Sequence, residues 1–381
     1  MKNKSYLRNS PWLRIGIIAV LGLLLLPVIA LCFNSPVEMI LGAVGIAGTI
    51  NMLDLTKANS NDVVGPIVEE AVGEYPEMTN IAANQLGAGE LSYQSLTRTG
   101  YPSAGFHDMG GGHAPSKSQT KLERFETFPF GGRVEAAKHL ADNWKRGGAA
   151  ALFAFEALGI MKAAIFNICK QIWYGRAADG KGFPGLKNFT AFGTTVTDPL
   201  TSKSYPMCIN ATGTTANGAS SAYLVTSREN EIELQFGLGS PFDLPEPRIG
   251  DMVDPSDPNK KVEAYISVLQ GFAGLATPNV HCVRRICNLT DENGKGMTDA
   301  LLAQALKSFP AGKRPTAIYM SSNQRYRLQL SRTVVLQGQG GNRPNQPNIA
   351  PLPTEYDGIP IYATDAIGDT DAIEVAALAE E

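Results

Sequence analysis

The stretch that decides the fold, residues 148–175, reads GAAALFAFEALGIMKAAIFNICKQIWYG. Its apolar residues recur at spacings of three and four, and the stripe consists of Ala154, Leu158, Met161, Ile165, Ile168 and Ile172. This period places the stripe on one face of a helix, and the glycine at position 175 is typical of a helix end. A helix from Gly148 to Ile172 would be about 37 Å long at the usual rise per residue, which spans a domain.

A long hairpin is predicted before this helix. Residues 91–97 (LSYQSLT) and 121–126 (KLERFE) have strand-like composition, and the segment between them is rich in glycine. Two strands joined by so long a tip form a projecting hairpin, and a loop of this length in a compact domain is typical of a functional element.

Beyond the helix the chain is rich in strand patterns. Residues 221–228 and 231–236 predict a half-buried hairpin, and residues 241–258 predict proline-dense loops. Further predictions are strands at 262–269, 280–286, 316–320 and 359–363, a helix capped by Thr298, a helix or turn at 323–330, and a loop at 337–353. This mixed order predicts an α+β fold and argues against a doubly wound nucleotide-binding fold.

The composition excludes some classes of function. A formal net charge of -3 over 381 residues excludes a generally basic nucleic-acid binder. The five cysteines are widely spread, which is typical of reduced thiols in a cytoplasmic chain: Cys32, Cys169, Cys208, Cys282 and Cys287. Cys282 and Cys287 are close in sequence but no second cluster completes a zinc site, so we predict small buried apolar residues there. No catalytic, cofactor-binding or metal-ligating residue is predicted.

One segment, residues 175–182 (GRAADGKG), matches the first seven positions of the phosphate-binding loop GxxxxGK[ST]. The eighth position is Gly182, although magnesium binding needs a hydroxyl there. The segment also follows a predicted helix, whereas a phosphate loop precedes one. A glycine-rich helix exit is the better interpretation.

The N-terminus differs from the rest of the chain. After basic residues at positions 2, 4, 8 and 14, Ile15 to Phe33 carry no charge, which is typical of a transmembrane segment or a signal peptide. The exit at residues 31–33 lacks the small residues of a signal-peptidase site. Three hypotheses stay open for residues 1–51: a segment outside the mature protein, with removal or a start at Met39 or Met52; a hydrophobic arm buried in an assembly; and a membrane anchor.

Several stretches resemble, in the same order, the major capsid proteins of tailed phages with the HK97-like fold. The segment from TGYPSA at residue 99 to APSKS at residue 118 looks like their extended loop, and Glu135 to Trp173 look like their spine helix. Residues 174–186 are similar to the turn after that helix, and residues 221–236, 280–288 and 357–361 are similar to later strands. The resemblance covers residues 52–374.

The resemblance implies a subunit with a peripheral domain on the spine helix, an axial domain, and an arm and loop that reach neighbours. The implied division is a hydrophobic N-terminal segment at 1–51, an N-terminal arm at 52–90, the E-loop hairpin at 91–132, the spine helix and start of the peripheral domain at 133–186, and remaining peripheral strands and the axial domain at 187–381.

The resemblance also implies a function and partners. Subunits would assemble in the host cytoplasm into hexamers and pentamers of an icosahedral virion capsid around double-stranded DNA, which they contact non-specifically. Scaffolding, portal and decoration proteins would be further partners, and a membrane would not. The E-loop residues expected to contact neighbouring copies are Tyr101, Pro102, His107, His113, Lys117 and Lys121. Some relatives join chains by a lysine-to-asparagine bond, but no acceptor motif matches here.

Three alternatives stay open. An encapsulin-type shell has a related fold and encloses protein cargo. A membrane-anchored or secreted β-rich surface protein would keep Ile15 to Phe33 in a membrane. A nucleotide-binding enzyme would depend on Lys181 in the incomplete phosphate-loop motif.

Overall fold

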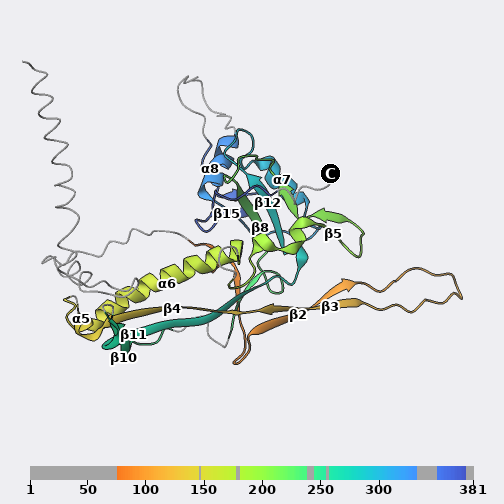
Figure 1. Cartoon of the computed structure of the whole chain (residues 1–381). Helices are drawn as coiled ribbons and strands as arrows, with labels where there is room; N and C mark the ends of the chain where they lie inside the picture. The colour runs from red at the N-terminus through yellow and green to blue at the C-terminus, as the bar shows by residue number, and fades with distance from the viewer. Residues whose placement is uncertain are drawn as a thin grey trace, which may run out of the picture. The chain divides into compact units, whose positions relative to one another are not determined.

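The computed structural model describes residues 75–145, 147–176, 181–237, 244–254, 257–332 and 350–374. Helices and strands alternate in a mixed order within these residues (Figure 1), which confirms the predicted α+β class. The described residues 134–154 and 247–267 form one compact unit, and the other described residues form a second. The strands β4 and β11 and the helix α6 contribute residues to both units.

The first unit has its own apolar core. It contains the end of β4 (Phe128–Ala137), α5 (Lys138–Asp142), the start of α6 (Gly148–Tyr174), and β10 (Arg248–Asp254) paired antiparallel with the first half of β11 (Asp257–Ala276). The prediction of loops throughout 241–258 is wrong for β10, whose residues contain no proline. The buried residues of this core are Ala136, Ala137, Leu140, Ala141, Trp144, Leu152, Phe153, Met252 and Ala264.

The second unit is built on a six-stranded sheet. Its order is β14 (Glu355–Tyr356), β15 (Ile359–Ala363), β13 (Ala317–Met320), β8 (Ser220–Val225), β12 (Val283–Leu289) and β7 (Cys208–Asn210). The strand β7 is therefore an edge strand, and it runs parallel to β12. The predicted strand at 359–363 is confirmed, and those at 280–286 and 316–320 are confirmed with shifted bounds.

Two helices pack their apolar residues into the same cluster as this sheet. They are α7 (Asp299–Lys307) and α8 (Ser322–Ser331), and Leu302, Ala305 and Leu328 are their fully buried contributions. The hydroxyl of Thr298 accepts the amide N–H of Leu301 at 3.3 Å, so the predicted N-cap is confirmed. The predicted loop at 337–353 lies largely outside the described residues.

A second group of strands in this unit corrects one prediction. The strand β9 (Glu233–Phe236) pairs parallel with β1 (Ala82–Gln85) and antiparallel with the end of β11, whereas β8 pairs with β12 and β13. The predicted hairpin of 221–228 with 231–236 is therefore wrong. The pairing with the first sheet continues to Thr226, whose amide donates to the carbonyl of Cys282 at 2.8 Å, and in the link that follows Asn230 takes a positive φ of 62°.

The remaining short elements complete the second unit. They are α4 (Glu77–Asn80), the pair β5 (Thr195–Thr197) and β6 (Ser204–Pro206), and the 3-10 turns η1 (Leu186–Asn188), η2 (Thr190–Gly193) and η3 (Val280–Cys282). Ile81, which directly follows α4, is buried in the core with Ile168 and Trp173. The described end of the predicted arm thus packs on its own chain.

The long helix α6 is confirmed, and it begins at Gly148 rather than near Glu135. Its stripe is buried only in part. Ile168 and Ile172 lie in the core of the second unit, while Ala154 is exposed and Leu158 is 60% exposed. Gly175 ends the helix at φ 62°, where an added Cβ would lie 2.0 Å from the amide nitrogen of Gly185, so only glycine fits.

A buried cation joins β12 to the end of α7. The Arg284 side chain is fully buried; its guanidinium donates to the carbonyl of Ser308 at 2.9 Å and to that of Val283 at 2.8 Å. Ser308 is the C-cap of α7, so the charge lies at the negative end of the helix dipole. Burial lowers the pKa of Arg284 to about 10, which keeps it protonated at neutral pH.

His281 lies beside this cation, and its position predicts how the stability of the folded chain depends on pH. Its Nδ1 is 3.2 Å from the guanidinium of Arg284. Burial and the charge of Arg284 lower its pKa, with a smaller contribution from Lys313, while Asp198 opposes the shift. The unfolded chain therefore binds a proton more readily. This contribution to stability is complete above about 6.5, the ordinary pKa of histidine, and is lost as the pH falls from there through the lower pKa of the folded state.

We expect His281→Gln to reduce the fall in the thermal unfolding midpoint between pH 7.5 and pH 5.5. The matched control is His139→Gln, because His139 is exposed at the end of α5. Scanning fluorimetry of the three chains at both pH values measures the difference. An equal fall in the wild type and His281→Gln would contradict the assignment.

Candidate inter-subunit contact surface

The hairpin is formed by two long antiparallel strands, β2 (Ser92–Gly100) and β3 (Gln119–Glu126) (Figure 1). Ser92 lies opposite Glu126 and Gly100 lies opposite Gln119. The connecting residues 101–118 contain no helix or strand, and residues 101–117 are exposed throughout. The predicted hairpin with a long tip is confirmed.

One face of the hairpin is held against its own chain. The hydroxyl of Tyr93 donates to Oδ1 of Asn230 at 3.1 Å, and that of Thr97 donates to the carbonyl of Pro278 at 3.3 Å. The ring of Tyr93 stacks on that of Phe125 with centroids 6.4 Å apart. Burial on this face raises the pKa of Tyr93. These contacts fix the hairpin at its base.

The opposite face carries an uncovered apolar pair. Leu96 and Leu122 lie directly opposite each other on β2 and β3, and they are 68% and 63% exposed. Side chains opposite each other on one face of a sheet are close enough to form a single patch. Arg98 and Arg124 are exposed on the same face. The single chain therefore presents an apolar pair flanked by cations, with its backbone already ordered.

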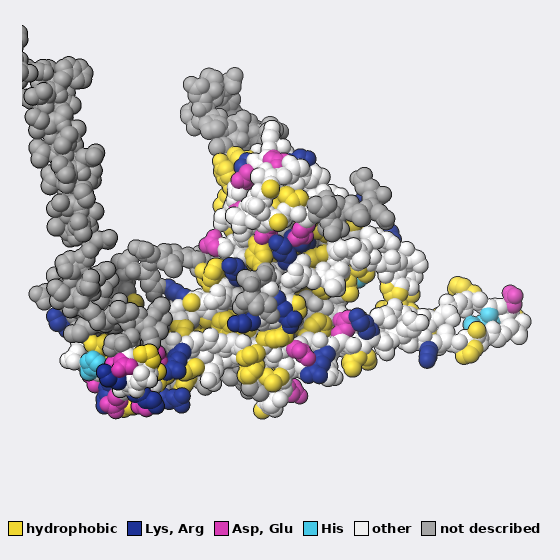
Figure 2. All heavy atoms as spheres, viewed as in Figure 1, with side chains coloured by type: hydrophobic (Ala, Val, Ile, Leu, Met, Phe, Trp, Pro, Cys, Tyr) yellow, Lys and Arg dark blue, Asp and Glu magenta, His cyan; other side chains and the backbone are white. Residues whose placement is uncertain are grey.

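The tip carries further exposed apolar groups. Phe106 and Met109 are fully exposed, and Figure 2 shows hydrophobic and histidine side chains gathered at the free end of the hairpin. The hydroxyl of Ser116 accepts the amide N–H of Ser103 at 3.0 Å and so joins the two limbs. Exposed large apolar residues on an ordered loop are typical of a protein contact site.

The six E-loop residues chosen from the sequence all lie on the tip or on the adjoining end of β3. The rings of His107 and His113 lie edge to face with centroids 4.2 Å apart. The guanidinium of Arg98 lies 5.6 Å from the ring centroid of Tyr101, and Lys121 pairs with Glu123 at 2.6 Å. Pro102 and Lys117 are exposed on the two limbs.

Sequence reasoning missed the apolar members of this surface: Leu96, Leu122, Phe106 and Met109. The alternation of strand residues places Leu96 on the face opposite to Tyr93, but which of the two faces packs on the chain depends on contacts that the sequence does not show.

The phosphate-loop resemblance lies in the wrong structural context. The described part of the segment wraps around the C-terminus of α6: the Gln171 amide donates to the carbonyl of Phe183 at 2.7 Å, and Nε of Arg176 donates to that of Gly182 at 2.8 Å. A helix C-terminus presents carbonyls and partial negative charge, which disfavour phosphate. Residues 177–180 lie outside the described part.

One described helix, α6, has the length and hydropathy of a membrane span. Its buried residues belong to the chain's own cores: Leu152 and Phe153 to that of the first unit, and Ile168 and Ile172 to that of the second. The apolar segment Ile15 to Phe33, the predicted span candidate, lies outside the described residues.

The long helix and the hairpin with an exposed tip are the two elements that the resemblance seen in the sequence implies. The chain belongs to the family of the major capsid protein GP7, whose family model matches residues 60–375. It is therefore a major capsid protein of a tailed bacteriophage, its place is the virion capsid, and it assembles with copies of itself. The resemblance seen in the sequence is confirmed.

A solved structure shows the same fold, and a second is reported for comparison. A chain of the bacteriophage epsilon15 structure is 18% identical, with a TM-score of 0.56 over 85% of this chain and 97% of its own length. A chain of the bacteriophage JBD30 capsid is 11% identical, with a TM-score of 0.47 over 78% of this chain and 91% of its own. A search of the curated proteins found no match.

Proposed function

We propose that the β2–β3 hairpin is the E-loop through which each subunit holds a neighbouring copy in the hexamers and pentamers of an icosahedral shell. The observation that carries this proposal is the exposed pair Leu96 and Leu122 on the outer face. Burying such a side chain fully contributes roughly 1.5–3 kcal/mol. Because Tyr93 and Thr97 already fix the inner face, docking costs little further ordering.

The tip residues are the second part of the proposed contact. Phe106 and Met109 project beyond the strands, together with Tyr101, Pro102, His107, His113 and Lys117, and Lys121 lies on the adjoining strand. Aromatic residues and methionine are enriched at protein interfaces, where they fill pockets on the partner. The role is structural, and neither catalysis nor a cofactor is part of the proposal.

The net charge of -3 suits a wall that encloses DNA and contacts it without sequence specificity. The family match favours a capsid over an encapsulin-type shell or an anchored surface protein. Because that match begins at residue 60, we propose that residues 1–51 are dispensable for assembly and that no membrane takes part. The segment boundaries drawn above, and scaffolding, portal and decoration partners, stay predictions.

Photo-crosslinking tests the hairpin contact directly. A benzophenone amino acid at position 106 is expected to join two chains when assembled particles are irradiated, giving a dimer band on a denaturing gel. The same protein dissociated in guanidinium should give monomers only. Efficient incorporation into particles without any dimer band would contradict the proposal.

A further inference from the structure

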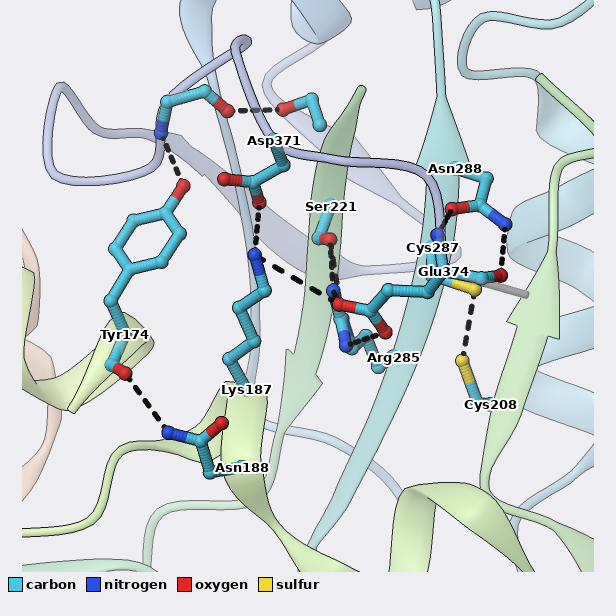
Figure 3. Close-up of polar contacts among 12 residues, drawn as sticks. Tyr174, Lys187, Asn188, Cys208, Ser221, Arg285, Cys287, Asn288, Asp371 and Glu374 are labelled. Carbon is cyan, nitrogen blue, oxygen red and sulfur yellow. Dashed lines mark hydrogen bonds and ion pairs between the residues drawn. The ribbon is translucent and has the colours of Figure 1, made fainter. Parts of the chain in front are cut away.

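Two thiols from distant parts of the chain meet at the edge of the six-stranded sheet. The Sγ atoms of Cys208 on β7 and Cys287 on β12 are 3.2 Å apart, although 79 residues separate them (Figure 3). Cys208 lies opposite Arg285 in the parallel pairing, so both cysteines and Arg285 share one face. Both cysteines are free of disulfide bonds.

The strand that carries Cys208 is the one best able to move. A disulfide needs the sulfurs about 2.0 Å apart, so the two must move closer than their present 3.2 Å. β7 has three residues and lies at the edge of the sheet, where β12 is its neighbour. A small shift of such a strand breaks no pairing on its other side.

One sulfur of the pair is easier to ionise than the other. Arg285 is buried on the same face, and its guanidinium contacts both carboxylate oxygens of Glu374, at 2.7 and 2.8 Å. The hydrogen bond from Cys208 lowers the pKa of Cys287, and the positive charge of Arg285 adds to this, whereas burial and the carboxylate of Glu374 oppose it. The same hydrogen bond and burial raise the pKa of Cys208, so one proton lies between the two sulfurs.

Solvent reaches the pair on one side. Cys208 is half-buried, whereas Cys287 is 1% exposed. The C-terminal segment lies beside this end of β12, because the backbone N–H of Glu374 donates to Asn288 at 2.9 Å and Asn288 donates back to the carbonyl of Glu374 at 3.0 Å (Figure 3). A small oxidant therefore meets Cys208 first.

We propose that Cys208 and Cys287 form an oxidative modification site at which hydrogen peroxide closes a disulfide between β7 and β12. The pair first releases one of its two thiol protons to solvent, and the remaining proton moves from Cys208 to Cys287. The Cys208 thiolate then attacks one peroxide oxygen; the O–O bond breaks, and the leaving hydroxide takes the proton of Cys287 and becomes water. The Cys287 thiolate attacks the sulfenic sulfur; the S–O bond breaks, and the leaving hydroxide takes a proton back from solvent and becomes the second water. Two thiols are oxidised and one peroxide is reduced to two waters.

Through this site, the stability of the capsid would depend on whether the surroundings of the particle are reducing or oxidising. Thiols stay reduced in the cytoplasm, where capsids assemble, and disulfides persist in oxidising surroundings. The bond would close a loop of 79 residues and fasten the edge strand, which restricts the unfolded chain. We expect the thermal unfolding midpoint to rise by several degrees on oxidation.

Peptide mapping tests the proposal on the full chain. The protein is treated with hydrogen peroxide, its remaining thiols are alkylated in guanidinium, and it is digested with trypsin without reduction. Cleavage by trypsin leaves Cys208 in the peptide of residues 204–228 and Cys287 in the peptide of residues 286–295. Cys282 and Cys169 lie in other peptides. The expected product is these two peptides joined, 2 Da lighter than their sum and released by dithiothreitol.

Matched variants separate the pair from the other thiols. Cys208→Ser and Cys287→Ser should each abolish the joined peptide and the rise in midpoint. Cys282→Ala should retain both, because Cys282 is fully buried and burial raises its pKa. Recovery of both peptides in alkylated form after a peroxide dose that oxidises free cysteine, or joining of either to another cysteine, would overturn the proposal.

Discussion

Replacing Leu96 and Leu122 together with aspartate will stop shell assembly and leave the subunit folded. The two side chains are 68% and 63% exposed, so the substitution costs the isolated chain little. In the proposed contact it would replace two apolar side chains by two carboxylates, and taking such charges out of water costs several kcal/mol. Each shell repeats the contact many times, so the yield of particles should fall at least 100-fold.

Sedimentation of the expressed protein measures this effect, and circular dichroism of the unassembled fraction reports folding. The matched control is Leu96→Met with Leu122→Met, which keeps the patch apolar and should assemble like the wild type. Normal particles from the aspartate chain would show that the outer face of the hairpin does not carry the contact.

Replacing Trp173 with alanine will remove the anchor of the largest core and destabilise the subunit by about 4 kcal/mol. The indole is fully buried, with ring centroids 4.8 Å from Tyr223 and 5.1 Å from Tyr319. Its Nε1–H also donates to the buried carboxylate of Glu77 at 2.8 Å. The variant loses both the packing of a large side chain and a hydrogen bond to a buried acceptor.

Guanidinium unfolding of the unassembled chain, followed by circular dichroism, measures this loss. Trp173→Phe serves as the comparison, because it keeps an aromatic ring and removes the N–H, and we expect about half the effect. A loss below about 1 kcal/mol for the alanine variant would mean that this cluster does not anchor the core.

The sequence predicts local structure well where one pattern governs a segment. The period of α6, the cap at Thr298 and the two strand patterns of the hairpin are local signals, and the structure confirms each of them. The pairing of β8 and β9 was predicted wrongly because it depends on distant strands. Both are buried throughout, so their residues fit a central strand of any sheet.

The functional surfaces, too, could be predicted from the sequence only where a local pattern marks them. The tip of the hairpin could be found from its length and glycines, but the exposure of Leu96 depends on which face Tyr93 and Thr97 hold against the chain. Cys282 is the cysteine nearest to Cys287 in sequence, whereas the cysteine that contacts Cys287 in space is Cys208. The parallel pairing of β7 with β12 brings the two cysteines together, and no sequence spacing indicates that pairing.

Electron microscopy of the purified chain tests the central claim most directly. The chain from Met52 onward and the full-length chain are expressed separately, purified and imaged in negative stain. We predict closed icosahedral particles or hexameric capsomers from the shorter chain, which would also show that residues 1–51 are dispensable. Folded but dispersed monomers from the shorter chain, with the full-length chain held in membranes, would contradict the account.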